Sequence, residues 1–381
     1  MPASWQILYS GVYNPTSPPP PVDISGIGIQ SLAINYGRAQ VQDPFQASTV
    51  TLTGRTPSAL PANIAVGDLF ACILKWNGTD AYQWSFVISD ISIRYGLVSN
   101  EDTWTIQGEG SIAQFGRAAI TQPGTIAAGT TTRAAAYTIA STGIGNGTNG
   151  YTIDWSAVSY PIDVASSTIS ALPYAVGDNL LDIVQKLART EQAFIRDSTY
   201  GRIFWTSRDT LAVQAATVEF TDGTLGTALI AAPYETVEFR SRADSYSPSV
   251  IVEPDGLAAQ RYGTDTRVFT LTSYDRTTTQ ARDLAAFVQG TLIASSAVPQ
   301  TVTWLDLKQS ADVYSGVIDV GKRVRVVLRG TRYECVVIGG SVVATETYTR
   351  ASLNFAAASQ YNYFQLDNSI LGVLDKGRLG F

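Results

Sequence analysis

The sequence of 381 residues contains no histidine, and this absence excludes more functions than any other feature of its composition. Ser-His-Asp and Cys-His activation of a nucleophile both need an imidazole as the base. Zinc sites with histidine ligands and histidine charge switches near neutral pH are excluded for the same reason. The sequence therefore points away from the common hydrolases and from pH-sensing proteins.

Cysteine and lysine are scarce. The two cysteines, Cys72 and Cys335, are far apart and form no CxxC pair, which excludes a zinc knuckle and a dithiol redox site. Both lie in apolar, strand-like runs, so we expect buried free thiols, although their number also allows one disulfide. Lys and Arg total 26 against 32 Asp and Glu, a net charge of −6. A general nucleic-acid binder would instead carry clustered cations.

Long apolar runs are also missing. No stretch of eighteen apolar residues is present, so no membrane span is expected. The opening residues "MPASWQILYSGVYNP" lack a basic segment followed by an apolar one, so no secretory signal is expected. We therefore expect a protein that is made and kept, or assembled, in a cytosol.

The residues that are plentiful favour strands. Tyr, Trp, Thr, Val, Gly and Ser abound, and alternating segments fill residues 24–118 and 301–360. Asn77-Gly78 lies between two apolar runs and predicts a hairpin. We expect a mainly β protein with α+β insertions, in which these two ranges form small antiparallel β-barrel domains. Residues 1–23 form an N-terminal strand and a Pro-rich connector, whose "NPTSPPPPVD" is either a stiff spacer or a ligand for a proline-binding groove.

The two predicted β domains resemble each other. The stretch from Val66, "VGDLFACILKWNGTDAYQWSFVISDISI", aligns with the stretch from Val320, "VGKRVRVVLRGTRYECVVIGGSVV". Each begins Val-Gly, continues as a strand, turns at a short loop and returns as a strand. Unrelated β domains can converge on this pattern, so a true repeat and a chance likeness both stay open.

The middle of the chain predicts an α+β insertion over 119–235 and an α+β linker over 236–300. Apolar spacing predicts a helix over 178–195, capped by Asp178 and followed by a hairpin near Tyr200-Gly201. A second helix is expected over 279–295, with a cap from the threonines at 277–279. Residues 111–168, rich in Ala, Thr, Gly and Ser, predict loops and short strands.

Motifs that could carry chemistry are weak. "GNGTNG" at 145–150 matches GxGxxG, but a strand-like "YTIDWSAV" follows it, where a dinucleotide site needs a helix. A loop is the better interpretation. Acidic pairs of the kind that glycosidases use are Glu101 with Asp102, Glu191 with Asp197, and Glu253 with Asp255, none in a signature. We expect no catalytic, cofactor-binding or metal-ligating residues and no cofactor.

Aromatic residues and the C-terminal stretch are left to explain. The aromatics Trp5, Tyr13, Trp76, Trp84, Trp104, Trp155 and Trp205 suit either core packing or a carbohydrate platform.

Residues 361–381, "YNYFQLDNSILGVLDKGRLGF", combine glycines with large apolar side chains, which are costly to leave in water. This tail packs either on its own domain or, as we favour, on a neighbouring subunit or partner; its candidate docking residues are Phe364, Leu366, Leu371, Leu374, Leu379 and Phe381.

Three segments give the chain a resemblance to the minor tail proteins, of baseplate hub type, of long-tailed phages of actinobacteria. They are "YGRAQVQDPFQASTVTLTGRTP" leading into "VGDLFACIL", the segment "LLDIVQKLARTEQAFIRDSTYGRIFWTSRD", and the ending "FQLDNSILGVLDKGRLGF". The resemblance implies two related β-barrels per chain and a homotrimer whose six barrels match a sixfold tail tube or distal tail ring. A threefold face then meets the tip or fibres.

The resemblance also implies partners and a location. The partners are other copies of the chain, the distal tail or tail tube protein, the tape measure protein, and other minor tail or fibre proteins. Nucleic acid is expected only to pass through a channel. The protein would reside in the virion tail tip after assembly in the host cytoplasm. Rival functions are a hexameric distal tail protein and a carbohydrate-binding receptor module.

Overall fold

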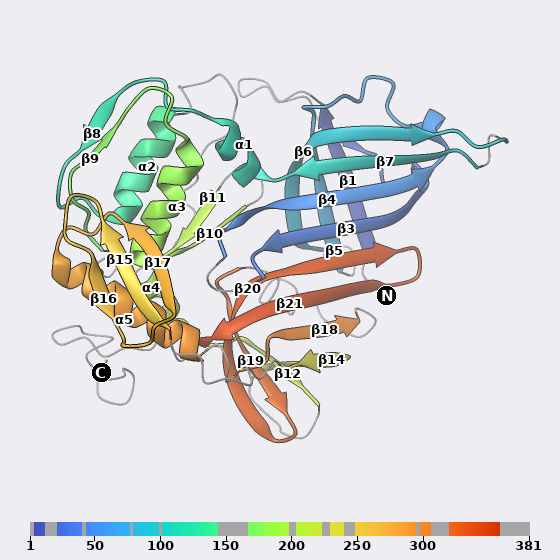
Figure 1. Cartoon of the computed structure of the whole chain (residues 1–381). Helices are drawn as coiled ribbons and strands as arrows, with labels where there is room; N and C mark the ends of the chain where they lie inside the picture. Colours follow the sequence, from blue (N-terminus) through green and yellow to red (C-terminus); the bar gives the residue numbers. More distant parts are fainter. Residues whose placement is uncertain are drawn as a thin grey trace.

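The computed structural model describes most of the chain, and strands dominate it (Figure 1). The described residues are 4–11, 21–39, 43–76, 79–98, 101–143, 167–197, 203–222, 229–239, 248–294, 298–305 and 320–358. This agrees with the mainly β class expected from the composition.

Six N-terminal strands form one antiparallel run in the order β3-β4-β7-β6-β5-β1. They are β1 (Ser4–Gly11), β3 (Ile29–Gly37), β4 (Gln46–Arg55), β5 (Leu69–Trp76), β6 (Thr79–Arg94) and β7 (Thr103–Glu109), with the short β2 (Val22–Asp23) on β1. Trp76 pairs with Thr79, as expected of a hairpin at Asn77-Gly78. The Trp5 indole N–H donates to Thr349 Oγ1 at 3.2 Å, so β1 lies close to a turn of the C-terminal strands.

The C-terminal strands form a second antiparallel group. β19 (Arg323–Leu328), β20 (Thr331–Thr345) and β21 (Thr349–Ala357) follow one another, and β18 (Thr301–Leu305) and β14 (Thr236–Glu238) extend the group beyond β21. Strands β12 (Val218–Thr221) and β13 (Ile230–Pro233) add to β19 in parallel. Parallel strands are usually buried on both faces, and all four residues of β12 are buried.

Strand β20 belongs to both groups. Its first half pairs with β19, while residues 339–345 pair with β3 on that same side, and β21 accompanies it on the other. The result is one continuous 14-stranded sheet in place of two separate ones. At the junction Gly339 lies opposite Gly37, where each backbone approaches the other too closely for a side chain.

The two aligned stretches share backbone contacts. Gly67 N donates to Ile88 O at 2.9 Å, and Ile88 N donates to Asp68 O at 2.8 Å. The same pair of contacts recurs in the C-terminal group, at 2.8 and 2.9 Å, among Gly321, Lys322 and Val337. Gly67 and Gly321 both have positive φ, +97° and +85°. Each return strand then has a bulge, between Ile88 and Asp90 and between Val337 and Gly339. The alignment from Val66 and Val320 therefore has a counterpart in the backbone.

A layer of helices lies beside the N-terminal strands (Figure 1). Helix α3 (Leu180–Glu191) is shorter than the 178–195 expected from apolar spacing. Asn179 caps it by accepting from Asp182 N, whereas the Asp178 carboxylate accepts from Ala175 N in the preceding turn, so the prediction of Asp178 as the cap was wrong. The helix ends at Gln192, where the backbone is left-handed.

The region after residue 110 corrects a second prediction. Residues 111–143 contain α1 (Ser111–Arg117), β8 (Gly124–Ile126) and α2 (Thr132–Gly143), where loops and short strands were expected. Helix α2 packs on α3 through small residues, with Ala135, Ala136 and Ala140 buried. The alanines and threonines of α2 give no clear separation of a polar face from an apolar face. The helix is therefore recognised only from its packing in the tertiary structure.

Short strands and one more helix complete this layer. β9 (Leu172–Tyr174) pairs with β8, and β10 (Phe194–Asp197) pairs with β11 (Ile203–Thr206). The predicted hairpin near Tyr200-Gly201 is thus present as a strand pair, although residues 198–202 lie outside the described part. Helix α4 (Arg208–Val213) follows, capped by Ser207.

A small α+β unit has a hydrophobic core of its own. β15 (Ser249–Pro254) lies between β16 (Gln260–Tyr262) and β17 (Val268–Ser273), and α5 (Thr278–Ala294) covers them. Helix α5 matches the 279–295 expected, and Thr277 Oγ1 accepts from Gln280 N as its cap. Lys186 joins this unit to α3 through a 2.6 Å contact with Asp255.

The main core runs without interruption beneath the long sheet and the helices α1 to α3. Its largest fully buried side chains include Trp104, Trp304, Phe86, Phe115 and Phe194. In the described part of the chain, no helix combines the length and apolarity needed to cross a membrane.

Candidate functional site

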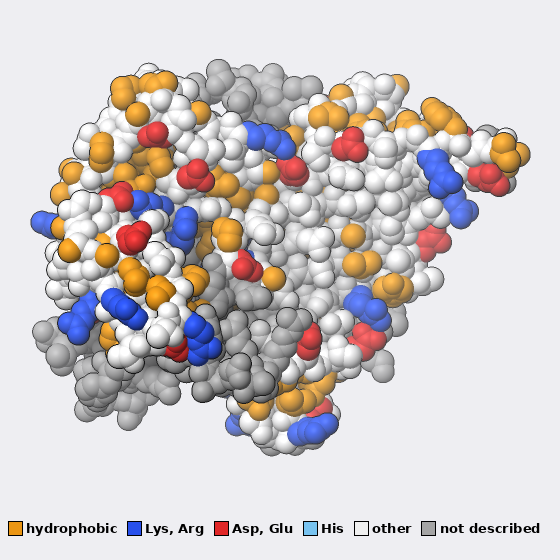
Figure 2. Space-filling model, in the orientation of Figure 1, with side chains coloured by type: hydrophobic (Ala, Val, Ile, Leu, Met, Phe, Trp, Pro, Cys, Tyr) orange, Lys and Arg blue, Asp and Glu red, His pale blue; other side chains and the backbone are white. Residues whose placement is uncertain are grey.

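One face of the long sheet is polar but nearly free of charge. Strand alternation turns one set of side chains into the core and the other outward. The uncharged members of the outward set across β7, β4, β3, β20, β21 and β18 are Thr103, Thr105, Gln107, Thr49, Thr51, Thr53, Ser31, Ala33, Asn35, Ser341, Val343, Ser352, Asn354, Thr301 and Thr303. Its charged members, Arg55, Glu109 and Arg350, lie near the ends of their strands. We call this surface the uncharged face. Figure 2 shows it as a broad area with few coloured side chains.

The register aligns these side chains in rows across the strands. One row passes through Thr303, Ser352, Ser341, Asn35 and Thr49. Hydroxyl groups contact one another along the face, for example Ser31 Oγ and Thr53 Oγ1 at 2.6 Å. A shallow hollow of about 270 Å³ lies over the junction of β3 with β20. The middle of this surface offers hydrogen bonds and few fixed charges, with Arg38 beside the hollow, so it holds phosphate groups only weakly.

The turn between β6 and β7 carries the most exposed apolar residues of the described chain. Leu97 is 101% exposed and Tyr95 74%, and Ile93 and Val98 are also exposed. Gly96 N donates to Asp102 Oδ1 at 2.9 Å across the turn. We call Ile93, near the end of β6, and Tyr95, Leu97 and Val98, in the turn that follows, the hairpin tip. The turn extends beyond the end of the sheet (Figure 1). Such a cluster usually marks a contact with another molecule.

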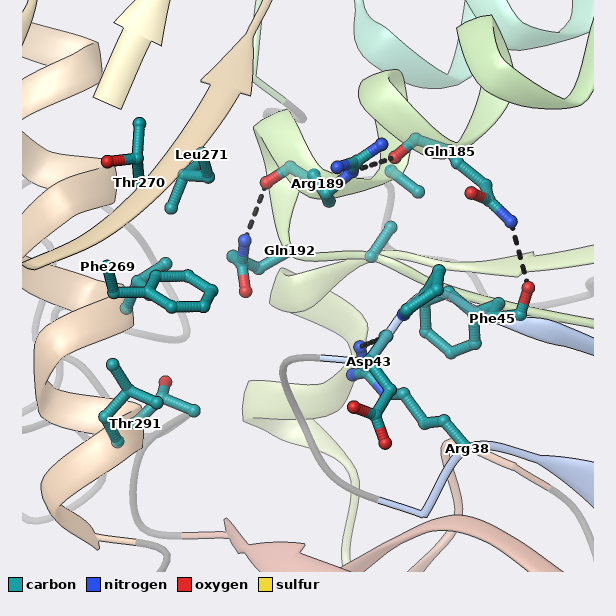
Figure 3. A pocket seen from close by; sticks show the side chains of 15 residues that line it. Arg38, Asp43, Phe45, Gln185, Arg189, Gln192, Phe269, Thr270, Leu271 and Thr291 are labelled. Carbon is teal, nitrogen blue, oxygen red and sulfur yellow. Dashed lines mark hydrogen bonds between the residues drawn. The ribbon is translucent and has the colours of Figure 1, made fainter. Parts of the chain in front are cut away.

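A cleft of about 100 Å³ lies where the small α+β unit meets α3, Arg38 and residues 43–45 (Figure 3). Phe269, Leu271 and Leu292 form one wall, and Phe45 and Ala188 lie on the other. Polar residues surround this apolar floor, among them Gln185, Gln192, Arg189 and Thr270.

Arg38 shapes the second wall of the cleft. Its guanidinium lies over the rings of Phe45 and Phe194, 4.1 and 4.7 Å from their centroids, and Nη1 donates to Asp43 O at 3.4 Å. Gln185 Nε2 donates to Phe45 O at 2.9 Å and so ties α3 to the same segment. These contacts hold the second wall of the cleft in place. The apolar walls can take up an apolar side chain, and the polar residues around the opening can contact polar groups beside it.

Several members of the acidic pairs considered from the sequence make structural contacts. Asp102 holds the β6–β7 turn, and Asp255 pairs with Lys186. Glu191 is buried and accepts from Thr132 Oγ1, whereas Asp197 contacts a different set of groups. Among the described residues, no group of three or more His, Cys, Asp or Glu is placed to hold a metal ion.

Asp197 joins three elements, which the sequence did not reveal. Its Oδ2 accepts from Ser48 N at the start of β4, and its Oδ1 accepts from Ile112 N in the first turn of α1, both at 2.5 Å. The residue as a whole is half-buried. Burial of its carboxyl group raises its pKa to about 6, although the hydrogen bonds from the two backbone N–H groups act to lower it. Since Gly110, the N-cap residue of α1, has no side chain to cap it, Asp197 supplies the cap from β10.

The two thiols are buried and free, as expected. Burial raises the pKa of both Cys72 and Cys335 far above the ordinary range, so neither is a nucleophile at neutral pH.

A thiol titration checks this burial. In the native protein we expect no reaction of Cys72 or Cys335 with a thiol reagent such as DTNB over an hour, and two equivalents after unfolding in guanidinium. Fast labelling of one thiol in the native state would contradict its burial.

Aromatic residues mostly serve the core. Trp84, Trp104 and Trp205 are buried, and Trp5 is half-buried and stacks on Trp84 at 5.8 Å between ring centroids. Core packing is therefore confirmed for these residues. Tyr13 and Trp155 lie outside the described residues.

Two further predictions also fall outside the described residues. They are the loop at 145–150 and the C-terminal docking residues Phe364, Leu366, Leu371, Leu374, Leu379 and Phe381. The role of the tail stays a prediction. Sequence reasoning missed the hairpin tip, although "RYGLVSNED" places apolar residues beside a polar turn, which is a readable signal.

Three solved structures with a similar fold are tail proteins, two of them from prophages. The 43 kDa tail protein of prophage MuSo2 from Shewanella oneidensis matches with a TM-score of 0.60 and 13% identity over 93% of this chain and 99% of that one. A tail protein from Neisseria meningitidis matches with 0.61 and 12% over 94% and 98%. Prophage tail protein gp18 from Listeria monocytogenes gives 0.50 and 10% over 92% and 94%.

Sequence comparisons add nothing to this likeness: no protein-family model and no curated protein matches the chain. The structural likeness covers nearly the whole of each chain, so it concerns the fold as a whole and not one part of it.

Proposed function

We propose that this chain is a structural protein of a phage tail tip, a homotrimeric baseplate hub that joins a sixfold tail tube or distal tail ring to a threefold tip or fibres. The observation that carries the proposal is the whole-chain fold likeness to two tail proteins, one of them from a prophage, at TM-scores of 0.60 and 0.61. On the residue resemblance alone, the phage is a long-tailed one that infects actinobacteria, and the protein is not an enzyme.

The repeated backbone contacts support the trimer. Each chain contains two hairpin units with equivalent turns at Gly67 and Gly321, joined edge to edge through β20. Three such chains would present six equivalent units, which is what a threefold part needs in order to meet a sixfold ring. In this arrangement the chain meets the distal tail or tube protein, the tape measure protein and fibre proteins.

The uncharged face supports a channel-facing role. In a ring of six units, the broad Ser, Thr and Asn surface of β4, β3 and β20 is suited to line a passage for nucleic acid. A lining rich in Arg or Lys would hold the phosphates by releasing counterions and so slow passage.

The proposal is tested by the mass of the purified full chain in solution. We expect three times the chain mass of 40.8 kDa. We also expect truncation after Gln360 to reduce the trimer to monomers, because we propose that residues 361–381 dock on a neighbouring subunit. A trimer that survives truncation contradicts only the tail's role. A hexamer favours a distal tail ring, and a monomer that binds glycans favours a receptor module.

A further inference from the structure

Two features of the described chain are left unused by a hub with a polar channel: the apolar hairpin tip and the cleft beside α3. We propose that the hairpin tip of one copy inserts into the cleft of the next copy, with Leu97 entering between Phe45 and Phe269. The inference rests on the proposed self-assembly and names the contact that performs it.

The two features cannot meet within one chain. Figure 1 places the β6–β7 turn at one end of the molecule, whereas β17, α5 and α3 lie at the other. A contact between them therefore joins different copies. Because the two surfaces differ, the interface is heterologous, and a heterologous interface closes into a ring when the rotation between neighbours fits.

The tip and the cleft match in size and polarity. The cleft of about 100 Å³ is smaller than the ~150 Å³ apolar cavity that takes up benzene, and so suits one aliphatic side chain. Its apolar walls are formed by Phe269 and Leu271 on one side and Phe45 on the other. Leu97 is fully exposed, and Tyr95 and Val98 beside it would cover the polar rim.

Charge also favours the match. Glu101 and Asp102 flank the tip and exceed the one cation, Arg94, in this turn. The cleft has the opposite balance, since Arg38 and Arg189 face a single carboxylate, Asp43. Arg189 is exposed on α3, where its Nε donates to the carbonyl oxygen of Gln185 at 3.4 Å. The two rims therefore attract each other at modest ionic strength.

Disulfide trapping tests the contact. Both natural cysteines are buried, so an engineered pair reports without interference. We would combine Leu97→Cys with Thr270→Cys, an exposed residue on the cleft wall, in the full-length chain. Under mild oxidation we expect a covalent closed trimer on a non-reducing gel. The control combines Leu97→Cys with Tyr137→Cys, which is exposed on α2 and does not line the cleft.

The outcomes separate this inference from the hub itself. If trimers form in solution but do not cross-link at this pair, or cross-link equally in the control, the contact between tip and cleft is overturned. The proposed trimeric hub stays consistent with that result. Monomers without cross-links contradict both. A ladder of growing oligomers keeps the contact but contradicts the closed ring.

A single substitution gives a second readout. Leu97→Asp should raise the dissociation constant of the assembly by about 10- to 100-fold for each contact, since the burial of one leucine side chain is lost. Its thermal unfolding as a monomer should not change, because the side chain is fully exposed within the chain. Unchanged assembly in Leu97→Asp overturns the inference.

Discussion

Replacing Gly339 with alanine is expected to lower the free energy of unfolding by about 3 kcal/mol. A Cβ atom at this position would lie 2.5 Å from both Arg38 N and Arg38 O and 2.7 Å from Tyr36 O. All three are backbone atoms, so no side chain can rotate away. The sheet must separate where β3 meets β20, which is the seam between the two hairpin groups.

Chemical denaturation followed by tryptophan fluorescence measures this effect. Gly290→Ala is the matched control, because Gly290 lies inside α5 and a Cβ there meets no atom within 4 Å. Alanine at that position should be neutral or stabilise the chain by up to about 1 kcal/mol. Equal stability of the Gly339 and Gly290 variants would show that β3 and β20 do not approach each other closely enough at Gly339 to exclude a side chain.

Replacing Asp197 with alanine is expected to cost about 2–4 kcal/mol at pH 7, because Ser48 N and Ile112 N each lose an acceptor in a half-buried position. Asp197→Asn should cost less, since one oxygen still accepts while the amide nitrogen opposes the other donor. The stability should therefore fall in the order wild type, Asn, Ala.

The control for Asp197 is Glu346→Ala, an exposed acid in the β20–β21 turn, which should change stability by less than about 0.5 kcal/mol. Thermal unfolding of the four proteins provides the comparison. If Asp197→Ala and Glu346→Ala unfold alike, the bridge between β4, α1 and β10 contributes nothing to stability.

The raised pKa gives this bridge a pH dependence. The pKa of Asp197 is about 6 in the folded chain against an ordinary 3.8, so the folded state holds the proton more tightly. Stability from this group is therefore greatest below about pH 4 and falls as the pH rises to about 6. The difference between wild type and Asp197→Ala should shrink from pH 4 to pH 7. Asp275, whose pKa burial also raises to about 6, should behave in the same way.

Local patterns in the sequence predicted local structure well. Alternation and turn residues located the β5–β6 and β19–β20 hairpins, and apolar spacing located α3 and α5 to within a few residues. These signals are local, because the side chains that determine them are neighbours in the chain. The burial of the two thiols was also predicted from a local signal, because each cysteine lies in an apolar, strand-like run of the sequence.

Structure that depends on distant residues was not predicted. Nothing near 331–345 indicates that this strand pairs with residues 31–37, and nothing near β12 indicates a parallel partner in β19. Asp197 is 85 residues from the helix it caps. Helix α2 was missed because its buried face is made of alanines, whose packing against α3 has no signature in the sequence.

The position of β20 in both groups has a consequence for synthesis on the ribosome. Strand β3 is complete at residue 37, but the strand that covers its outer edge is residues 339–345, near the end of the described chain. At roughly 5–20 residues per second, the ribosome needs about 15–60 s to make the intervening chain. Throughout that time the nascent protein exposes an unpaired edge, which is a template for pairing with other chains. Elongation, and not the intrinsic speed of β folding, then decides how long each new chain is open to aggregation.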